Sequence, residues 1–236
     1  MRVTAVGVVV PVHDEEKLLP RCLAAVRAAA AGCGVPVHVV VVLDACADGS
    51  AAAAAAVGEV ATSTTLLTVN LRCVGAARAL GCRHVLDRLG VAGTWLANTD
   101  ADSAVPPDWL ERGLAYAAED YDAVAGTVEV DDWSTHDADV RSAYVAGYQD
   151  RWDHRHVHGA NLVVSGQAYA AVGGFDPVVC HEDAGLARAL IAAGRAIAWA
   201  DDLPVLTSGR IRGRTPGGFS GYLRSLADDT APEAVA

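Results

Sequence analysis

The chain has 236 residues, of which 52% are hydrophobic and 20% are charged, and it carries a formal net charge of −11. This length suits one α/β domain, alone or with a small added lobe, and the composition excludes disorder over most of the chain. The negative charge argues against a nucleic-acid backbone as the natural partner, so an anionic substrate needs a local basic or metal-bearing site.

Targeting and redox signals favour a protein of the cytoplasm. No run approaches the roughly 18 apolar residues of a membrane span. The apolar segment 3–12 is followed by His-Asp-Glu-Glu, where a signal peptide would have small residues at its cleavage site. Six scattered cysteines form no Cys-x-x-Cys pair, so we interpret them as small buried hydrophobes in a reducing compartment. A disulfide framework is the alternative.

The first half of the chain alternates apolar runs with helical patterns. Strands are predicted at residues 6–10, 37–43, 66–69 and 95–97, and helices at 15–31, from 48 or 50 through an alanine-rich run, at 74–89 and at 108–118. Strands and helices that alternate at this spacing form βαβ units. We therefore predict an α/β fold with a mostly parallel, Rossmann-like sheet flanked by helices.

The second half of the chain is less regular. Strands are predicted at residues 123–130, 162–164 and 197–199, and helices at 137–153 and 182–193. Residues 208–218 are rich in Arg and Gly and are predicted to form a mobile loop. Residues 228–236 are predicted to be a frayed tail.

Two carboxylates, Asp100 and Asp102, follow the short apolar run at 95–97. In an extended segment, residues i and i+2 point the same way, so both carboxylates can face one site. Carboxylates at the end of a buried strand need a cationic partner, and Mg²⁺ or Mn²⁺ carrying the phosphates of a substrate is the simplest candidate. A solvated acidic turn before the next helix is the alternative.

Acidic residues also follow the first two predicted strands. His13-Asp14-Glu15 comes after the first strand, and Asp44 comes after the second. Ligands of open parallel sheets bind at the carboxyl ends of the strands, so three acidic clusters are expected at one edge of one sheet. This convergence favours a binding site over three unrelated surface turns.

Four motifs occur in a recognisable order. They are Val-Val-Val-Pro-Val-His-Asp-Glu-Glu at 8–16, Val-Val-Leu-Asp-Ala-Cys-Ala-Asp-Gly-Ser at 41–50, Asn-Thr-Asp-Ala-Asp-Ser at 98–103, and Val-Gly-Gly-Phe-Asp at 172–176 followed by His-Glu-Asp at 181–183. In order and spacing they resemble the family 2 glycosyltransferases, inverting enzymes of the GT-A fold, over roughly residues 5–200. The resemblance implies a single GT-A domain over 1–236, with a nucleotide-binding half at 1–103, an acceptor half at 104–205, and a lid and C-terminal helix at 206–227.

The resemblance also implies a reaction, in which one sugar moves from a nucleoside diphosphate sugar to the hydroxyl of a small-molecule or carrier-linked acceptor. Asp183 looks like the base that takes the acceptor proton. Asp102 would bind Mn²⁺ or Mg²⁺, with His181 as the best candidate for a further ligand. A uridine diphosphate donor is expected in preference to a guanosine one, and its contacts would be Pro11, Val12, Glu15, Asp44, Arg78 and Asp100.

Several of these residues also have a purely structural interpretation. Asp44 suits a helix cap or an Asx-turn. Glu15 and Glu16 suit the first turn of a helix, which is the interpretation we favour for Glu16. Arg78 suits a surface position on an amphipathic helix.

The resemblance assigns further residues to the acceptor and to a lid. Trp152, His158, Asn161 and Glu182 are expected on the acceptor side, with Trp152 as a stacking platform. A zinc site formed by the three histidines between 154 and 158 is the alternative. The lid would close over the diphosphate through Arg210, Arg212 and Arg214, and a solvated basic loop is the alternative.

The sequence departs from the family pattern after the second strand. Leu43 and Ala45-Cys46 stand where an acidic residue and Gly-Ser are usual, which leaves the base open between uracil and guanine. The Gln-x-x-Arg-Trp motif of processive members is absent, in agreement with addition of one sugar at a time. A non-catalytic nucleotide-sugar binding protein and a nucleotidyltransferase are the alternatives. A dehydrogenase is disfavoured because no G-x-G-x-x-G follows the first strand.

Overall fold

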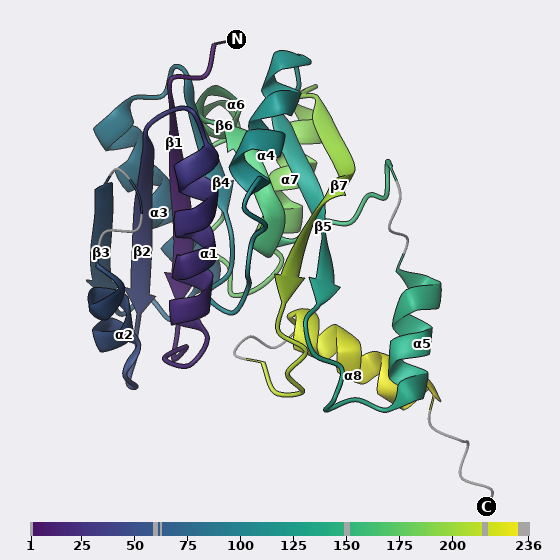
Figure 1. The fold of residues 1–236 in the computed structure, drawn as a ribbon. Coiled ribbons are helices and arrows are strands. Elements are labelled where there is room, and N and C mark those ends of the chain that lie inside the picture. The colour runs from purple at the N-terminus through teal and green to yellow at the C-terminus, as the bar shows by residue number, and fades with distance from the viewer. Residues whose placement is uncertain (1, 59–60, 62, 149–151, 214–216, 231–236) are drawn as a thin grey trace, which may run out of the picture.

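A computed structural model describes residues 2–58, 61, 63–148, 152–213 and 217–230 (Figure 1). Its core is a seven-stranded sheet in the order β3-β2-β1-β4-β6-β5-β7. The strands are β1 (Ala5–Val12), β2 (Val37–Asp44), β3 (Ser63–Val69), β4 (Thr94–Asn98), β5 (Ala123–Val130), β6 (Leu162–Ser165) and β7 (Ile197–Thr207). Only β6 runs antiparallel to its neighbours among these strands. The predicted α/β fold with a mostly parallel sheet is confirmed.

Helices cover both faces of the sheet (Figure 1). On one face, Val8 and Val10 of β1 share a core with Leu23 and Trp109, whereas Val9 belongs to the core of the opposite face. The β-branched run of β1 is buried on both sides, as expected for a central strand of a parallel sheet. The first face carries α1 (Leu19–Gly32), α2 (Ser50–Val57) and α4 (Trp109–Ala118), and the second carries α3 (Val74–Leu89), α6 (Gly166–Ala171) and α7 (Glu182–Ala192).

Two further helices lie beyond the carboxyl ends of the strands. Helices α5 (Ala138–Gly147) and α8 (Phe219–Thr230) pack against each other below β5 and β7, at the lower right of Figure 1. Tyr144 of α5 meets the rings of Phe219 and Tyr222 of α8 edge-on.

Some predicted boundaries are wrong for identifiable reasons. The helix expected from residue 15 begins at Leu19, because residues 13–16 turn across to the loop after β2. The strand expected at 197–199 continues to Thr207, because after a register shift beyond Gly126 its second half pairs with the end of β5. Helix α8 reaches Thr230 and so overlaps the predicted tail. The helix expected at 137–153 ends at Gly147, and residues 149–151 lie outside the described part.

Asn161 ties the irregular half of the sheet together. Its side-chain nitrogen donates to the carbonyl oxygens of Thr127 (2.8 Å) and Leu203 (2.5 Å), and its oxygen accepts from the indole N–H of Trp109 (2.9 Å). The side chain is fully buried. Asn161 was expected on the acceptor side, and the structure instead places it inside the fold, because the register shift between β5 and β7 leaves main-chain groups that it satisfies.

Replacing Asn161 by Ala should therefore destabilise the fold. The substitution leaves the Trp109 N–H and two carbonyl oxygens buried without these partners, at about 1–3 kcal/mol for each unsatisfied group. We expect the free energy of unfolding, measured by urea denaturation, to fall by about 3 kcal/mol or more. The exposed Asn70→Ala variant is the control and should change by less than about 0.5 kcal/mol. An Asn161→Ala variant as stable as this control would contradict the assignment.

A stack of aromatic and histidine rings joins α5 to the segment before β6. The ring of Tyr148 lies 4.9 Å from that of Tyr144 and 4.3 Å from that of His156, with interplanar angles of 13° and 11°. His158 Nε2 lies 2.9 Å from the Tyr148 hydroxyl, and Phe219 of α8 meets the His158 ring edge-on. Burial, reinforced by the neighbouring histidines, lowers the pKa of His158 to about 3.

This lowered pKa predicts a loss of stability in acid. Between pH 6.5, the ordinary histidine value, and about 3, the unfolded chain binds a proton that folded His158 does not. The free energy of unfolding should fall with decreasing pH by up to about 1.4 kcal/mol per unit through this group. A His158→Asn variant should lose stability less steeply between pH 6 and pH 4 in chemical denaturation, whereas the exposed control His181→Asn should follow the wild type. Parallel curves for His158→Asn and wild type would show that His158 is protonated normally.

Candidate active site

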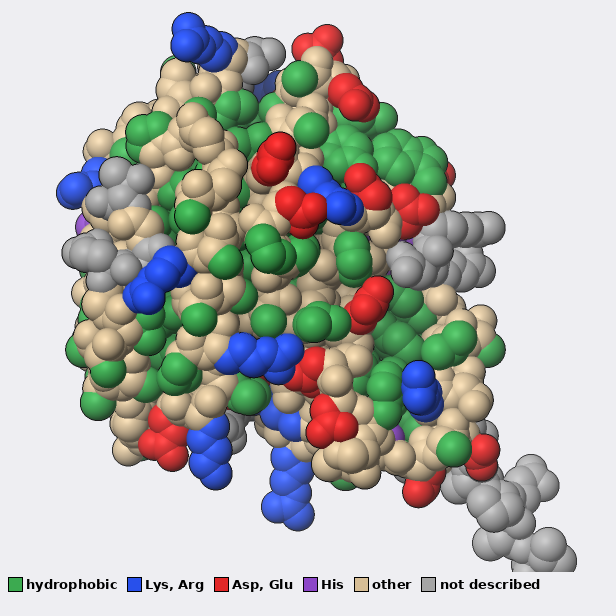
Figure 2. Space-filling model, in the orientation of Figure 1, with side chains coloured by type: hydrophobic (Ala, Val, Ile, Leu, Met, Phe, Trp, Pro, Cys, Tyr) green, Lys and Arg blue, Asp and Glu red, His purple; other side chains and the backbone are tan. Residues whose placement is uncertain are grey.

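A cavity of about 620 Å³ lies at the carboxyl ends of the strands. The ends of β1, β2, β4, β5 and β7 contribute to it, together with the first turns of α3, α7 and α8. This is the edge at which the sequence predicts a site. Figure 2 shows basic side chains projecting at the lower edge of the molecule, the same end to which the strands point in Figure 1.

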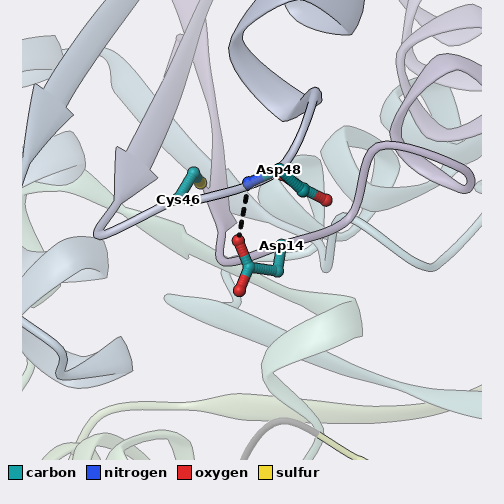
Figure 3. A group of neighbouring side chains, drawn as sticks. All are labelled: Asp14, Cys46 and Asp48. Carbon is teal, nitrogen blue, oxygen red and sulfur yellow. Dashed lines mark hydrogen bonds between the residues drawn. The ribbon is translucent and has the colours of Figure 1, made fainter.

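Hydrogen bonds between residues 12–16 and residues 46–48 hold the loops after β1 and β2 together (Figure 3), and we call this set of contacts the clasp. Asp14 accepts hydrogen bonds from the N–H groups of Ala47 (2.7 Å) and Asp48 (3.3 Å), and Asp48 accepts one from the N–H of Glu16 (3.0 Å). The Cys46 thiol donates to a carbonyl oxygen of β1. Glu16 therefore precedes α1 and belongs to this clasp, so its expected place in a first helical turn is wrong. The clasp fixes the main chain of residues 11–12 at the cavity wall.

Asp44 is buried at the end of β2 and orders the turn that enters α3. Its carboxylate accepts three hydrogen bonds, from the N–H groups of Leu71 (2.5 Å), Arg72 (2.9 Å) and Cys73 (3.0 Å). Asp44 also lines the cavity, together with Arg72 and Cys73, which sequence analysis missed. The helix cap or Asx-turn considered as the alternative for Asp44 is wrong, because its carboxylate bonds N–H groups 27 to 29 residues further along the chain.

Arg78 is buried and pairs with two carboxylates, so its interpretation as a surface arginine is wrong. Its side chain is 2% exposed, forms an ion pair with Asp100, and lies 3.0 Å from the carboxylate of Glu182. Burial alone would lower the pKa of Arg78, but the two carboxylates outweigh burial and raise it. Among the described residues no partner is found for Nη1 of Arg78. Gly159 lies against the guanidinium so closely that a Cβ there would collide with it.

Asp102 is neutralised by a second arginine, Arg210, which comes from the segment after β7. One guanidinium nitrogen lies 2.5 Å from Glu15, and the other lies 2.7 Å from Asp102. Burial and the charge of Asp100 raise the pKa of Asp102, while Arg210 opposes them. Arg212 is exposed, and Arg214 lies outside the described residues.

The donor set fits a hard divalent cation. Asp100 and Asp102 both line the cavity, and the guanidinium at Asp102 is a positive group already seated against this carboxylate. His181 lines the same cavity at the start of α7, with a positive φ of 62°. In the described part of the chain, the only His, Cys, Asp and Glu trio with ligand atoms within 4.8 Å of one another is the clasp trio of Figure 3. Asp100, Asp102 and His181 therefore line one cavity without forming such a trio.

Asp183 lies at the first turn of α7 and faces the cavity. One carboxylate oxygen accepts from the N–H of Gly159 and the other from the N–H of Ala184, both at 2.7 Å. Glu182, one residue earlier, is buried and paired with Arg78. Burial raises the pKa of Glu182, although Arg78 acts in the opposite direction.

The residues expected on the acceptor side are divided by the structure. His158 lines the cavity, but Trp152 lies at a second, smaller cavity and stacks on Tyr116, with ring centres 6.1 Å apart. The histidines at 154–158 stack on one another instead of converging on a common point, which disfavours the zinc alternative. Phe219 and Tyr222 of α8 also line the cavity. Only the apolar spacing of the C-terminal helix hinted at them, and nothing in it indicated which cavity they would reach.

Comparison with known proteins identifies the family. The family model described as glycosyl transferase family 2 matches residues 7–173. The chain is 31% identical over 130 residues to the undecaprenyl-phosphate 4-deoxy-4-formamido-L-arabinose transferase of Sodalis glossinidius, covering 54% of this chain and 38% of that protein. The corresponding protein of Klebsiella pneumoniae is 33% identical over 128 residues, covering 53% and 37%. The chain thus spans less than half the length of the curated relatives it matches.

Solved structures with the same fold are more distant in sequence. The mannosyltransferase PcManGT from Pyrobaculum calidifontis, in complex with GDP-Man and Mn²⁺, has a TM-score of 0.70 at 22% identity, covering 98% of this chain and 66% of that chain. S. aureus TarS 1–349 in complex with UDP has a TM-score of 0.66 at 15% identity, covering 88% and 60%.

Within the described residues, no helix is both long and apolar enough to cross a membrane. All six cysteines carry free thiols. Cys22, Cys33 and Cys82 are buried as expected, whereas Cys46, Cys73 and Cys180 are only half-buried. Because the family model covers most of the chain and the sheet has the architecture of its solved relatives, this chain belongs to glycosyl transferase family 2 and has the GT-A fold.

Proposed function

We propose that this protein transfers one sugar from a nucleoside diphosphate sugar to an acceptor hydroxyl, with Mn²⁺ or Mg²⁺ at the diphosphate and inversion at the anomeric carbon. The observation that carries the proposal is the convergence of Asp44, Asp102 and Asp183, far apart along the chain, on one cavity. Family membership supports the class of reaction. The complexes of two relatives, with UDP and with GDP-Man and Mn²⁺, support the class of donor.

The donor end of the cavity suits a nucleoside diphosphate. Pro11 and Val12 offer main-chain groups at the end of β1, held by the clasp. Asp44 is proposed to accept a hydrogen bond from the nucleobase. A carboxylate has about four acceptor positions, and three are used by main-chain N–H groups, so one remains for a base N–H. Uridine diphosphate is the expected donor, and guanosine diphosphate is the alternative.

Asp100 and Asp102 are proposed to hold the cation, with His181 as a further ligand. When bound, the cation acts as a Lewis acid that stabilises the charge developing on the leaving diphosphate. Arg78 holds the Asp100 carboxylate in a fixed position through their ion pair. Glu15 is proposed to act at the same end, because Arg210 already joins it to Asp102.

Asp183 is proposed as the base. The N–H groups of Gly159 and Ala184 fix the direction of its carboxylate and leave lone pairs for the acceptor proton. The acceptor oxygen then attacks the anomeric carbon opposite the diphosphate, so one displacement inverts that centre. A hydroxyl acceptor needs such a base because it must lose a proton. Next to this site, His158 and Phe219 offer rings on which an acceptor can stack.

Two substitutions should separate donor binding from proton transfer. Asp102→Asn removes the charge proposed to hold the cation, so cation-dependent binding of UDP or GDP should be lost in calorimetric titration with Mn²⁺. Asp183→Asn keeps the size of the side chain and one acceptor oxygen for the main-chain N–H groups, but it cannot take a proton, so binding should persist while transfer falls by about 10²–10⁴-fold. Transfer is measured against a panel of nucleotide sugars and acceptors.

The matched control is Asp87→Asn, an exposed carboxylate near the far end of α3, which should bind and transfer like the wild type. Wild-type transfer rates in Asp183→Asn would remove the base assignment. Cation-dependent nucleotide binding in Asp102→Asn would remove its role. Nucleotide-sugar binding without transfer or donor hydrolysis would favour a non-catalytic binding protein, and release of pyrophosphate from a nucleoside triphosphate would favour a nucleotidyltransferase.

A further inference from the structure

The guanidinium of Arg210 lies where the proposed cation would be needed. It bridges two carboxylates from different strand ends, Glu15 after β1 and Asp102 after β4, at 2.5 Å and 2.7 Å. Both carboxylates are largely buried, with side-chain exposures of 7% and 13%. Two buried carboxylates facing one another need a positive partner, and Arg210 supplies it.

The guanidinium groups of Arg78 and Arg210 differ in how readily they can separate from their carboxylate partners. Arg78 is 2% exposed and held by Asp100 and Glu182, so removing it would leave an unpaired charge inside the protein. Arg210 is 26% exposed at the cavity wall, so its guanidinium can move into the cavity while staying in contact with water. Arg78 is therefore a fixed element of the site, whereas Arg210 is exchangeable.

The main chain before Arg210 is anchored, so this exchange needs only side-chain rotation. The N–H of Gly209 donates to Asp131 (3.2 Å), and its carbonyl oxygen accepts from Nε2 of His136 (2.5 Å). A Cβ at residue 209 would collide with the carbonyl oxygen of Asp132. The long side chain of Arg210 can thus rotate about an anchored main chain. It is long enough to reach both the acidic pair and the neighbouring cavity.

We propose that Arg210 is a resident counter-ion which the divalent cation displaces from Asp102, and that the released guanidinium then pairs with the donor diphosphate. This inference rests on the cation site of the proposed function. The exchange keeps the charge of Asp102 compensated, because the cation takes the place of the guanidinium beside this carboxylate while the guanidinium meets the incoming anion. Binding of the donor and binding of the cation are thereby coupled, because both favour the state in which the Arg210 guanidinium has left Asp102.

The test measures Mn²⁺ binding to the full chain without nucleotide, from the electron paramagnetic resonance signal of free Mn²⁺. Arg210→Gln removes the competitor and should bind Mn²⁺ about 10-fold more tightly than the wild type. Arg210→Lys keeps one charge but cannot bridge both carboxylates in the same way, so its affinity should lie between the two. Adding UDP should raise the Mn²⁺ affinity of the wild type by a larger factor than that of Arg210→Gln.

Arg112→Gln is the matched control, because it removes the same charge from an ion pair on α4 outside the cavity, and its Mn²⁺ affinity should equal that of the wild type. If the wild type binds Mn²⁺ with UDP but Arg210→Gln and Arg210→Lys bind Mn²⁺ no more tightly than the wild type, the counter-ion role is wrong and the proposed function stands. If the wild type binds no Mn²⁺ even with UDP, the cation site itself is wrong, and this inference falls with it.

Discussion

The ion pairs made by the buried Arg78 hold the two ends of the cavity at a fixed separation. The arginine comes from α3, Asp100 follows β4, and Glu182 opens α7, so three elements that are distant in sequence meet at one guanidinium. Removing one partner of such a buried pair typically costs about 3–5 kcal/mol, because the other charge is left without compensation. Asp183 follows Glu182 directly, so the position of the proposed base is tied to the acidic motif through this arginine.

The charges at the cavity bear on how an acidic protein would bind the anionic donor that we propose. Among the described residues that line the cavity, carboxylates outnumber guanidinium groups. A diphosphate would be repelled by this surplus unless a positive group entered with it or was already present. The distribution of the arginines meets this need in two ways. Arg78 is locked within the fold, and Arg210 lies at the wall within reach of the solvent.

The sequence was sufficient to predict the sheet and the acidic residues at its edge. Apolar runs, helical periodicity and the rule for parallel sheets bring Asp44, Asp100 and Asp102 together without any knowledge of side-chain packing. The family resemblance, by contrast, was wrong in placing Trp152 and Asn161 on the acceptor side. Both precede β6, the strand that runs against its neighbours, and its insertion between β4 and β5 depends on long-range pairing that local patterns do not encode.

The burial of Arg78 could not be predicted from the local sequence either. An arginine on an amphipathic helix has the same sequence pattern whether it faces solvent or carboxylates. Its burial is decided by Glu182, which lies more than a hundred positions further along the chain. Phe219 and Tyr222 were missed for a related reason. Their helix packs mainly on α5, so no strand position fixes where their rings point.

The position of α8 separates the aromatic wall of the cavity from its acidic wall. The helix supplies aromatic rings to the cavity, yet the acidic residues come from strand ends and from α7. Substitutions at the rings of α8 would therefore change the cavity wall, while the carboxylates proposed to bind the cation would keep their spacing. This layout places the rings proposed to meet the acceptor and the carboxylates proposed to meet the donor on different elements of the fold.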